Sequence, residues 1–170
     1  MISRKTWIVL VMTAVALTAF AVQPWAQDSE SDDANPLAPC ERLVGGKWYS
    51  DQNYQVFEWG IGKKSVNGKS YWVVDGEPKL VGEGFFFWHP GDEAIRGYFT
   101  GTEMGIDLFE YSLKWEGDSM IADLTTYGSM AGDFEEIWEF TNDSTFEWTL
   151  NQIAADGTKS KMMGSTYTRR

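Results

Sequence analysis

Alternating apolar and polar residues run through most of the sequence after residue 46. Residues 106–115 give the clearest case, since every second side chain is large and apolar: Phe109, Tyr111, Leu113 and Trp115. A repeat of two residues is the period of a β-strand with one buried face and one solvated face. The same period recurs in residues 52–61, 134–141 and 145–152. The pattern therefore predicts a fold built from strands.

Turn signals separate about ten such segments at short and regular spacing, which is typical of barrels and sandwiches. Asn67-Gly68 is the strongest hairpin signal, because both residues tolerate positive φ. Residues 40–44 have room for one helical turn, and no long amphipathic helix is indicated. Closing a sheet removes its exposed edges, so we expect one antiparallel up-and-down β-barrel of about ten strands.

The interior of this barrel is predicted to be rich in aromatic rings. The chain has nine Trp, ten Phe and seven Tyr, and aromatic residues favour strands while supplying large buried areas. Barrels with more than about eight strands have room for a small ligand. We therefore expect a cavity that holds a small, mostly apolar ligand. The alternative is an interior that the aromatic rings fill.

The first 39 residues are predicted to lie outside the barrel domain, which we assign to residues 40–170. Residues 1–21 have the features of a signal peptide: Arg4 and Lys5, an uncharged apolar run, and a small-x-small ending at Ala21. Cleavage after Ala26 is an alternative. Residues 22–39 are acidic and interrupted by proline, which predicts a flexible linker. We expect an exported protein, periplasmic or extracellular, without a stable membrane anchor after cleavage.

Charge and cysteine content narrow the list of partners. The formal net charge of −11 repels nucleic acid at long range, so no nucleic-acid partner is expected. Cys40 is the only cysteine, which excludes a disulfide within the chain. We expect it to behave as a small buried hydrophobic residue, with intermolecular pairing as the less favoured alternative.

Short motifs at both ends of the domain carry a family resemblance. Leu43-Val-Gly-Gly-Lys-Trp48 opens the domain and Tyr167-Thr-Arg-Arg170 ends it. Over about residues 40–170 the chain resembles the uncharacterised lipocalin-like proteins of bacteria, a domain-of-unknown-function group in the wider calycin set. Gly46-Lys47-Trp48 is similar to the Gly-x-Trp of lipocalins. The resemblance implies that Trp48 closes the barrel floor with Arg169 packed over it.

Nitrobindin-type haem barrels are a second comparison. Their haem is held by a histidine late in the chain, where this sequence offers Tyr167 and no histidine. We therefore expect no cofactor. His89 is the only histidine, so Ser-His-Asp chemistry and multi-histidine metal sites are not expected. It ends a strand at a turn, either as a polar contact at the barrel mouth or as a rim residue without a special role.

Glu136 is the carboxylate with the clearest chemical potential. It occupies the same set of alternating strand positions as Trp138 and the neighbouring aromatic residues, so it should point inward with them. We call this shared set of alternating positions the parity of a residue. A carboxylate in an apolar interior needs a partner, or its pKa rises. Glu136 would then orient a ligand or act as an acid or base. Alternatively, it reaches water or pairs with Arg96 or a lysine. Glu135 and Glu139 are expected on the solvated face.

The candidate ligand-binding residues combine the inward aromatic side chains with these two polar groups: His89, Phe109, Tyr111, Trp115, Glu136, Trp138 and Trp148. A binding module is the favoured interpretation. An enzyme of the isomerase or cyclase type, using Glu136, Glu83 or His89 as a lone acid or base, is the second. A protein-interaction module is the third, because four consecutive aromatic residues load both faces of one strand and could form an oligomer contact: Phe85, Phe86, Phe87 and Trp88.

Overall fold

The structure is a computed structural model that describes residues 35–51, 53–102 and 105–170. Residues Ala34–Arg170 form one compact unit. The predicted signal peptide and most of the predicted linker lie outside the described residues. Among the residues that are described, no helix is both long enough and apolar enough to span a membrane.

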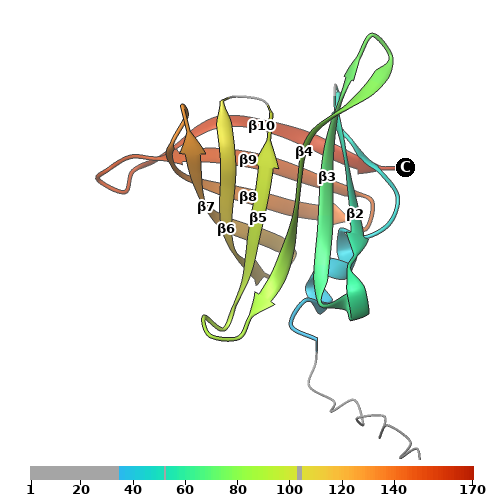
Figure 1. The fold of residues 1–170 in the computed structure, drawn as a ribbon, viewed down its shortest axis with the longest axis horizontal. Helices are drawn as coiled ribbons and strands as arrows, with labels where there is room; N and C mark the ends of the chain where they lie inside the picture. The colour runs from blue at the N-terminus through green and yellow to red at the C-terminus, as the bar shows by residue number, and fades with distance from the viewer. Residues whose placement is uncertain (1–34, 52, 103–104) are drawn as a thin grey trace, which may run out of the picture. The chain divides into compact units, whose positions relative to one another are not determined.

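The described chain forms ten strands that close into a single barrel (Figure 1). Their bounds are β1 Trp48–Tyr49, β2 Asn53–Trp59, β3 Ser65–Val74, β4 Glu77–His89, β5 Ala94–Gly101, β6 Ile106–Glu116, β7 Ser119–Gly128, β8 Gly132–Asn142, β9 Thr145–Ile153 and β10 Lys159–Arg169. Two short 3-10 helices, η1 (Ala38–Arg42) and η2 (Ile61–Lys63), accompany them. The predicted all-β barrel and the single helical turn near residue 40 are confirmed.

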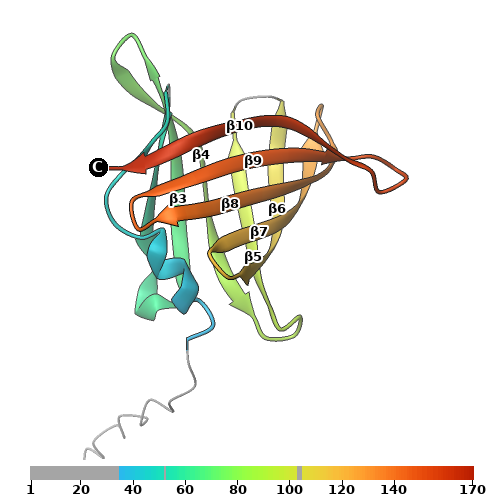
Figure 2. The same ribbon diagram turned by 180° about the vertical axis from the view of Figure 1, so that it is seen from behind.

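Every strand pairs antiparallel with its neighbours in the sequence, and Figure 2 shows β8, β9 and β10 side by side. The short strand β1 closes the circle between β2 and β10. Trp48 lies opposite Arg169 of β10 on one side and opposite Gln55 of β2 on the other. The up-and-down topology follows from the short connections between strands, because antiparallel strands need only a tight turn between them.

The hairpin predicted at Asn67-Gly68 is wrong, because both residues lie inside β3. The turn is formed instead by Asp75 and Gly76, whose φ angles are 53° and 85°. Figure 1 shows the resulting β3–β4 hairpin projecting beyond the neighbouring strands. Gly68 serves close packing: a Cβ there would lie 2.8 Å from the Phe99 ring. A glycine that admits a neighbouring ring gives the same sequence signal as a turn glycine.

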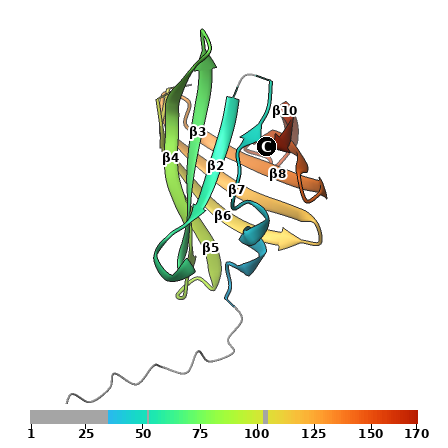
Figure 3. The same ribbon diagram turned by 90° about the vertical axis from the view of Figure 1, so that its right-hand side faces the viewer.

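One end of the barrel is closed by η1 and the residues that flank it (Figure 3). Leu37, Cys40, Leu43 and Trp48 are at most 1% exposed. The Trp48 indole donates a hydrogen bond to the Leu43 carbonyl (2.8 Å), and the Arg169 guanidinium lies 4.4 Å from the Trp48 ring centre. The predicted floor is therefore confirmed. The buried Leu37 extends the folded unit beyond the predicted boundary at residue 40.

Cys40 is part of this floor. Its side chain is fully buried, and burial raises the pKa of the thiol to about 11. The thiol is therefore protonated at neutral pH and packs as an apolar group, as expected from the sequence.

Candidate functional site

Aromatic rings cover the inner wall of the barrel in a continuous series of contacts. The ring centre of Phe86 on β4 lies 4.8 Å from that of Phe99 and 5.7 Å from that of Tyr111. On the opposite side, Trp138 of β8 stacks on Phe146 at 5.7 Å. Strand alternation explains the arrangement, because these residues occupy every second position of their strands. The close approach of β5 depends on Gly97, where a Cβ would lie 2.4 Å from the Phe86 ring.

Glu136 lies within this aromatic wall and is 7% exposed. The Tyr111 hydroxyl of β6 donates to its Oε1 at 3.4 Å, and the Trp138 indole donates to its Oε2 at 3.1 Å. Trp148 of β9 is a third hydrogen-bond donor toward the same carboxyl. These four side chains are the Glu136 cluster. In the described chain, every group that hydrogen-bonds this carboxyl is neutral.

The chemistry of the Glu136 cluster is set by burial. Loss of hydration raises the pKa of Glu136 from 4.5 to about 7, against the lowering effect of the three donors. Burial and the neighbouring carboxyl raise the pKa of Tyr111 well above its usual value. Burial also raises the pKa of Tyr167 on β10, and the charge of Glu136 adds to this effect. The carboxyl thus exchanges its proton near neutral pH while both tyrosines stay protonated.

The end of the barrel opposite η1 is lined by small residues. Gly82, Gly101, Ser70 and Ser165 belong to the inward-facing alternation of β4, β5, β3 and β10, and each is half-buried. Ser165 lies opposite Trp148, which is itself half-buried although it packs against the core. Small side chains therefore fill less of this end than the large buried side chains fill of the η1 end.

The structure brings together most of the residues predicted to bind a ligand. Tyr111, Glu136, Trp138 and Trp148 form one cluster, and Phe109 stacks on Tyr111 at 6.5 Å. The parity argument for an inward Glu136 is thus confirmed, whereas a pairing with Arg96 is wrong. Trp115 lies near the floor and not in this cluster. Its ring stacks on that of Phe140 at 5.7 Å, and the Phe140 ring also contacts Trp48 of the floor.

His89 is not part of this group, because it lies beside the β4–β5 turn on the outer side of the barrel. Its side chain is 44% exposed, and its Nδ1 accepts a hydrogen bond from the backbone N–H of Asp92 at 3.1 Å.

The four consecutive aromatic residues of β4 do not form one patch, because they are divided between the two faces of the barrel wall. Phe86 is 1% exposed inside the barrel, whereas Phe85 is 43% exposed outside, and Trp88 packs against the core.

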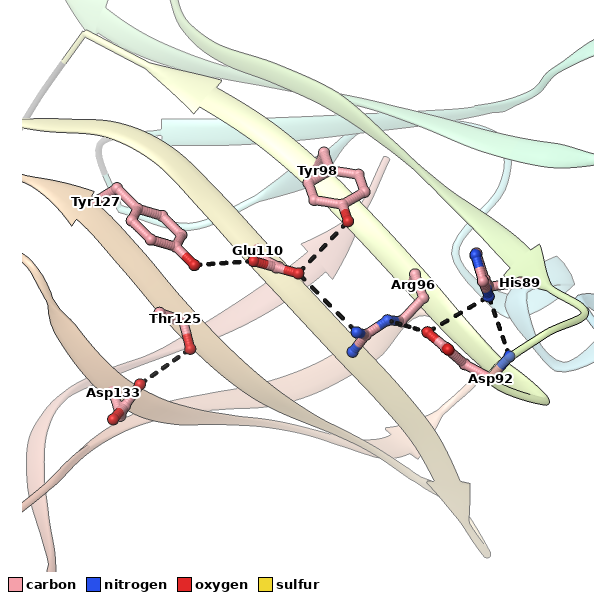
Figure 4. A network of polar contacts seen from close by, with 8 residues as sticks. All are labelled: His89, Asp92, Arg96, Tyr98, Glu110, Thr125, Tyr127 and Asp133. Atoms are coloured by element: carbon pink, nitrogen blue, oxygen red, sulfur yellow. Dashed lines mark hydrogen bonds and ion pairs between the residues drawn. The ribbon is translucent and has the colours of Figure 1, made fainter.

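A second polar network runs along the outer face of β5, β6 and β7 (Figure 4). Glu110 is its centre, accepting hydrogen bonds from Tyr98 (3.4 Å) and Tyr127 (3.0 Å). Arg96 Nη2 lies 4.0 Å from Glu110, and Arg96 Nε lies 3.1 Å from Asp92. Tyr98 and Tyr127 are 38% and 45% exposed, so solvent reaches this network. We call it the Glu110 network.

Glu135 is not the solvated residue that its parity predicts. It faces outward, yet it is only 8% exposed. Lys159 of β10 and Asn151 of β9 hydrogen-bond its two carboxylate oxygens and cover it. The alternation gives the face of the barrel correctly, but long side chains from the next strands decide how much water reaches that face.

A groove of about 480 Å³ lies on the outside of the barrel between β2 and β6, with Phe85, Tyr98 and Glu83 among its lining residues. Across the described ranges, no group of three or more His, Cys, Asp or Glu side chains is arranged to hold a metal ion. Inside the barrel, Gln55 Oε1 is buried and has no hydrogen-bond partner in the described residues.

Sequence reasoning missed Gln55, Phe86 and Phe99 as residues of the inner wall. Gln55 is two residues from Phe57, which packs on Trp138 at 5.8 Å, so strand parity alone could have placed Gln55 inside. Phe86 was hidden by its aromatic neighbours, because a run of four aromatic residues has no visible alternation.

The fold defines the class: this is a closed antiparallel up-and-down β-barrel of ten strands. No family model matches the sequence, and no curated protein matches it. Among solved structures, the barrel is similar to that of Rv2717c from Mycobacterium tuberculosis, with a TM-score of 0.52 and 15% sequence identity. The match covers 81% of this chain and 98% of the other, and it concerns the fold alone.

Proposed function

We propose that this protein binds a small, mostly apolar ligand inside its barrel, with the polar group of the ligand directed at Glu136. The observation that carries the proposal is a single carboxyl, 7% exposed, set in a wall of aromatic rings. Ligand sites are commonly apolar cavities with one or a few polar groups that fix orientation. The resemblance of the sequence to lipocalin-like barrels supports the proposal.

The direction of entry follows from the two ends of the barrel. The η1 end is blocked by four side chains that are at most 1% exposed, with Trp48 among them. The opposite end carries the small residues Gly82, Gly101 and Ser70, and Ser165 lies opposite the half-buried Trp148. A ligand that enters there approaches the Glu136 carboxyl from the side away from Trp48, because Glu136 lies one inward position further from the floor than Trp138 and Trp148.

Native mass spectrometry tests the proposal. Full-length protein purified without denaturant should carry a stoichiometric extra mass, and that mass should be lost after denaturing extraction and refolding. The refolded protein should take up an apolar fluorophore with quenching of Trp148, and Trp148→Phe should lose that quenching. A clean apo mass together with no uptake of any apolar probe would contradict the proposal.

Acid–base catalysis is a second candidate function, favoured by the Glu136 pKa of about 7. A carboxyl that exchanges protons near neutral pH suits the acid or base of an isomerase. The two functions differ in the fate of the bound compound. A carrier releases it unchanged, whereas an enzyme converts it at a rate that falls at least about a hundredfold in Glu136→Gln.

We also propose export, on the basis of Arg4, Lys5 and the apolar run that follows them. The intact mass of the protein recovered from the secreted or periplasmic fraction tests this, and it distinguishes cleavage after Ala21 from cleavage after Ala26. Recovery only of full-length protein inside the cell would contradict it.

A further inference from the structure

We propose that the ligand of the Glu136 cluster is an amine: a molecule with an apolar body and one protonated nitrogen, which pairs with the Glu136 carboxylate between Trp138, Trp148 and Tyr111. This inference rests on the proposed function, because it names the chemical class of ligand for the same interior site. It follows from three independent properties of the inner wall, namely charge, aromatic character and the kind of hydrogen-bonding group left over.

The first property is the missing positive charge. Buried carboxylates in proteins are usually paired with a cation, because desolvation of an unpaired charge is costly. The groups that act on Glu136 are Tyr111, Trp138 and Trp148, all neutral. Arg169 points inward at the floor, where it lies over Trp48 and donates to the Arg42 carbonyl. A bound ammonium would therefore supply the cation that the wall around Glu136 lacks.

The second property is the ring of aromatic side chains around the carboxyl. Trp138 and Trp148 occupy paired positions on the adjacent strands β8 and β9, and Tyr111 reaches the carboxyl from β6. The Phe86 ring contacts both Tyr111 (5.7 Å) and Trp138 (6.4 Å), so it completes the wall. The faces of aromatic rings attract ammonium groups, and Trp is the strongest of them. Rings around a carboxylate form the kind of cage that recognises amines.

The third property is the kind of hydrogen-bonding atom that remains available. Three buried side-chain atoms have no hydrogen-bond partner in the described chain: the acceptor Gln55 Oε1, and the donors Trp115 Nε1 and Arg169 Nε, which belong to the floor. Glu136 is an acceptor as well when it is ionised. An ammonium group carries three N–H donors and no acceptor, whereas a fatty-acid carboxylate is acceptor-only. The ionised Glu136 carboxyl therefore matches an amine and opposes a carboxylate by both charge and hydrogen bonding.

Three ligands with the same nine-carbon chain test the inference: nonylamine, nonanol and nonanoate. Their affinities for the refolded full-length protein are measured at pH 8 by quenching of tryptophan fluorescence. We expect nonylamine to bind at least about tenfold more tightly than nonanol, and nonanoate to bind the most weakly. Glu136→Gln should bring nonylamine to within about threefold of nonanol, since the charge that distinguishes them is gone. Glu110→Gln on the outer face should leave the preference unchanged.

The outcomes separate this inference from the proposed function. If nonanol or nonanoate binds as tightly as nonylamine, the barrel is a carrier and the amine preference is wrong. If none of the three binds, the proposed function itself is contradicted. Circular dichroism of Glu136→Gln confirms that the variant folds. Glu136→Asp is a second variant that keeps the charge and should retain part of the preference.

The pH dependence of nonylamine affinity separates a charge-pairing role of Glu136 from a structural one. A structural role alone would not change the affinity with pH. The titratable groups facing this carboxyl are Tyr111 from β6 and Tyr167 from β10, and the raised pKa of each keeps it neutral through this range. Nonylamine affinity should rise about tenfold or more between pH 5 and pH 8, as Glu136 ionises. Nonanol affinity should not rise, and Glu136→Gln should bind nonylamine equally at both values. A flat profile for nonylamine in the unmodified protein would contradict the pairing.

Discussion

Glu136 and Glu110 occupy the two faces of one barrel, and aromatic side chains donate hydrogen bonds to each. Glu136 has Tyr111 and Trp138 as donors, at 3.4 and 3.1 Å, and Trp148 as a third. Glu110 has Tyr98 and Tyr127, at 3.4 and 3.0 Å (Figure 4). The inner carboxyl is 7% exposed, whereas the outer carboxylate is near Arg96 and water.

The comparison shows that the number of hydrogen bonds does not decide what a carboxyl can do. Donors lower the pKa of Glu136, but burial outweighs them and raises it to about 7. In the Glu110 network, the carboxylate lies 4.0 Å from the Arg96 guanidinium and is open to solvent. The outer network is therefore a surface feature of modest energy, and the inner cluster is a place where a ligand changes the balance of charge.

The largest difference in stability between substitutions on the two faces is expected for the neighbouring phenylalanines Phe85 and Phe86 of β4. Phe86→Ala removes a ring that is 1% exposed and should lower the free energy of unfolding by about 3–5 kcal/mol. Phe85→Ala removes a ring that is 43% exposed and should cost less than about 1 kcal/mol. Urea denaturation of both variants measures this. Equal losses would mean that the inward and outward faces of β4 are assigned wrongly.

The second prediction concerns the pH dependence of stability. The folded pKa of Glu136 is about 7, above the unfolded value of 4.5. The protonated Glu136 carboxyl therefore contributes its full stabilisation of the folded state below the unfolded pKa. This contribution is lost as pH rises through the folded pKa, because Glu136 releases its proton at lower pH in the unfolded chain than in the folded protein. The loss for this group is about 3 kcal/mol. The Glu136→Gln variant should not show this loss of stability, because glutamine does not ionise.

Unfolding free energies measured below pH 4.5 and above pH 7 provide the check. Relative to the unmodified protein, Glu136→Gln should be more stable at the higher pH by up to about 3 kcal/mol, with little difference at the lower pH. Glu110→Gln is the matched control and should change stability by less than about 1 kcal/mol. A Glu136→Gln effect that is the same at both pH values would contradict the buried carboxyl.

The third prediction compares two consecutive arginines at the end of β10. Arg169 lies 4.4 Å from the Trp48 ring centre and donates to the Arg42 carbonyl, so Arg169→Met should cost about 1–2 kcal/mol. Arg170 lies 5.3 Å from the Tyr49 ring and is exposed, so Arg170→Met should cost less than about 0.5 kcal/mol. Thermal unfolding measures both, and a larger loss for Arg170→Met would reverse the assignment of the floor.

The smallest effect on stability is expected for a substitution in the Glu110 network. Arg96→Met removes the contacts to Asp92 (3.1 Å) and Glu110 (4.0 Å), at a cost below about 1 kcal/mol. Because the network is open to solvent, the cost should shrink further in about 1 M salt. Denaturation at low and high salt measures it, and a cost independent of salt would show a buried network instead.

The architecture could be predicted because its signal is local. The alternation in residues 106–115 and its repetition along the chain gave a barrel of about ten strands, which the structure confirms. Asn67-Gly68 misled because Gly68 is required by the Phe99 ring from a different strand, and no local pattern reports that contact. Asp75-Gly76 is the real hairpin turn.

The candidate site could be predicted only as far as parity reaches. Parity assigns a residue to one face, so it placed Glu136, Tyr111, Trp138 and Trp148 inside together. It does not give the height of a residue along the barrel, which is why Trp115, near the floor, was grouped with them. It also does not report cover from neighbouring strands, and so Glu135 was expected in water although Lys159 shields it.

The most direct test of this account is an NMR titration of the Glu136 side-chain carboxyl carbon in ligand-free protein, assigned by comparison with Glu136→Gln. The account predicts one glutamate resonance with a midpoint near pH 7 that is absent in the variant. Saturating nonylamine should move that midpoint downward, because an ammonium partner favours the ionised form. A Glu136 midpoint near 4.5 in the ligand-free protein would contradict the buried carboxyl on which both the proposed function and the amine preference depend.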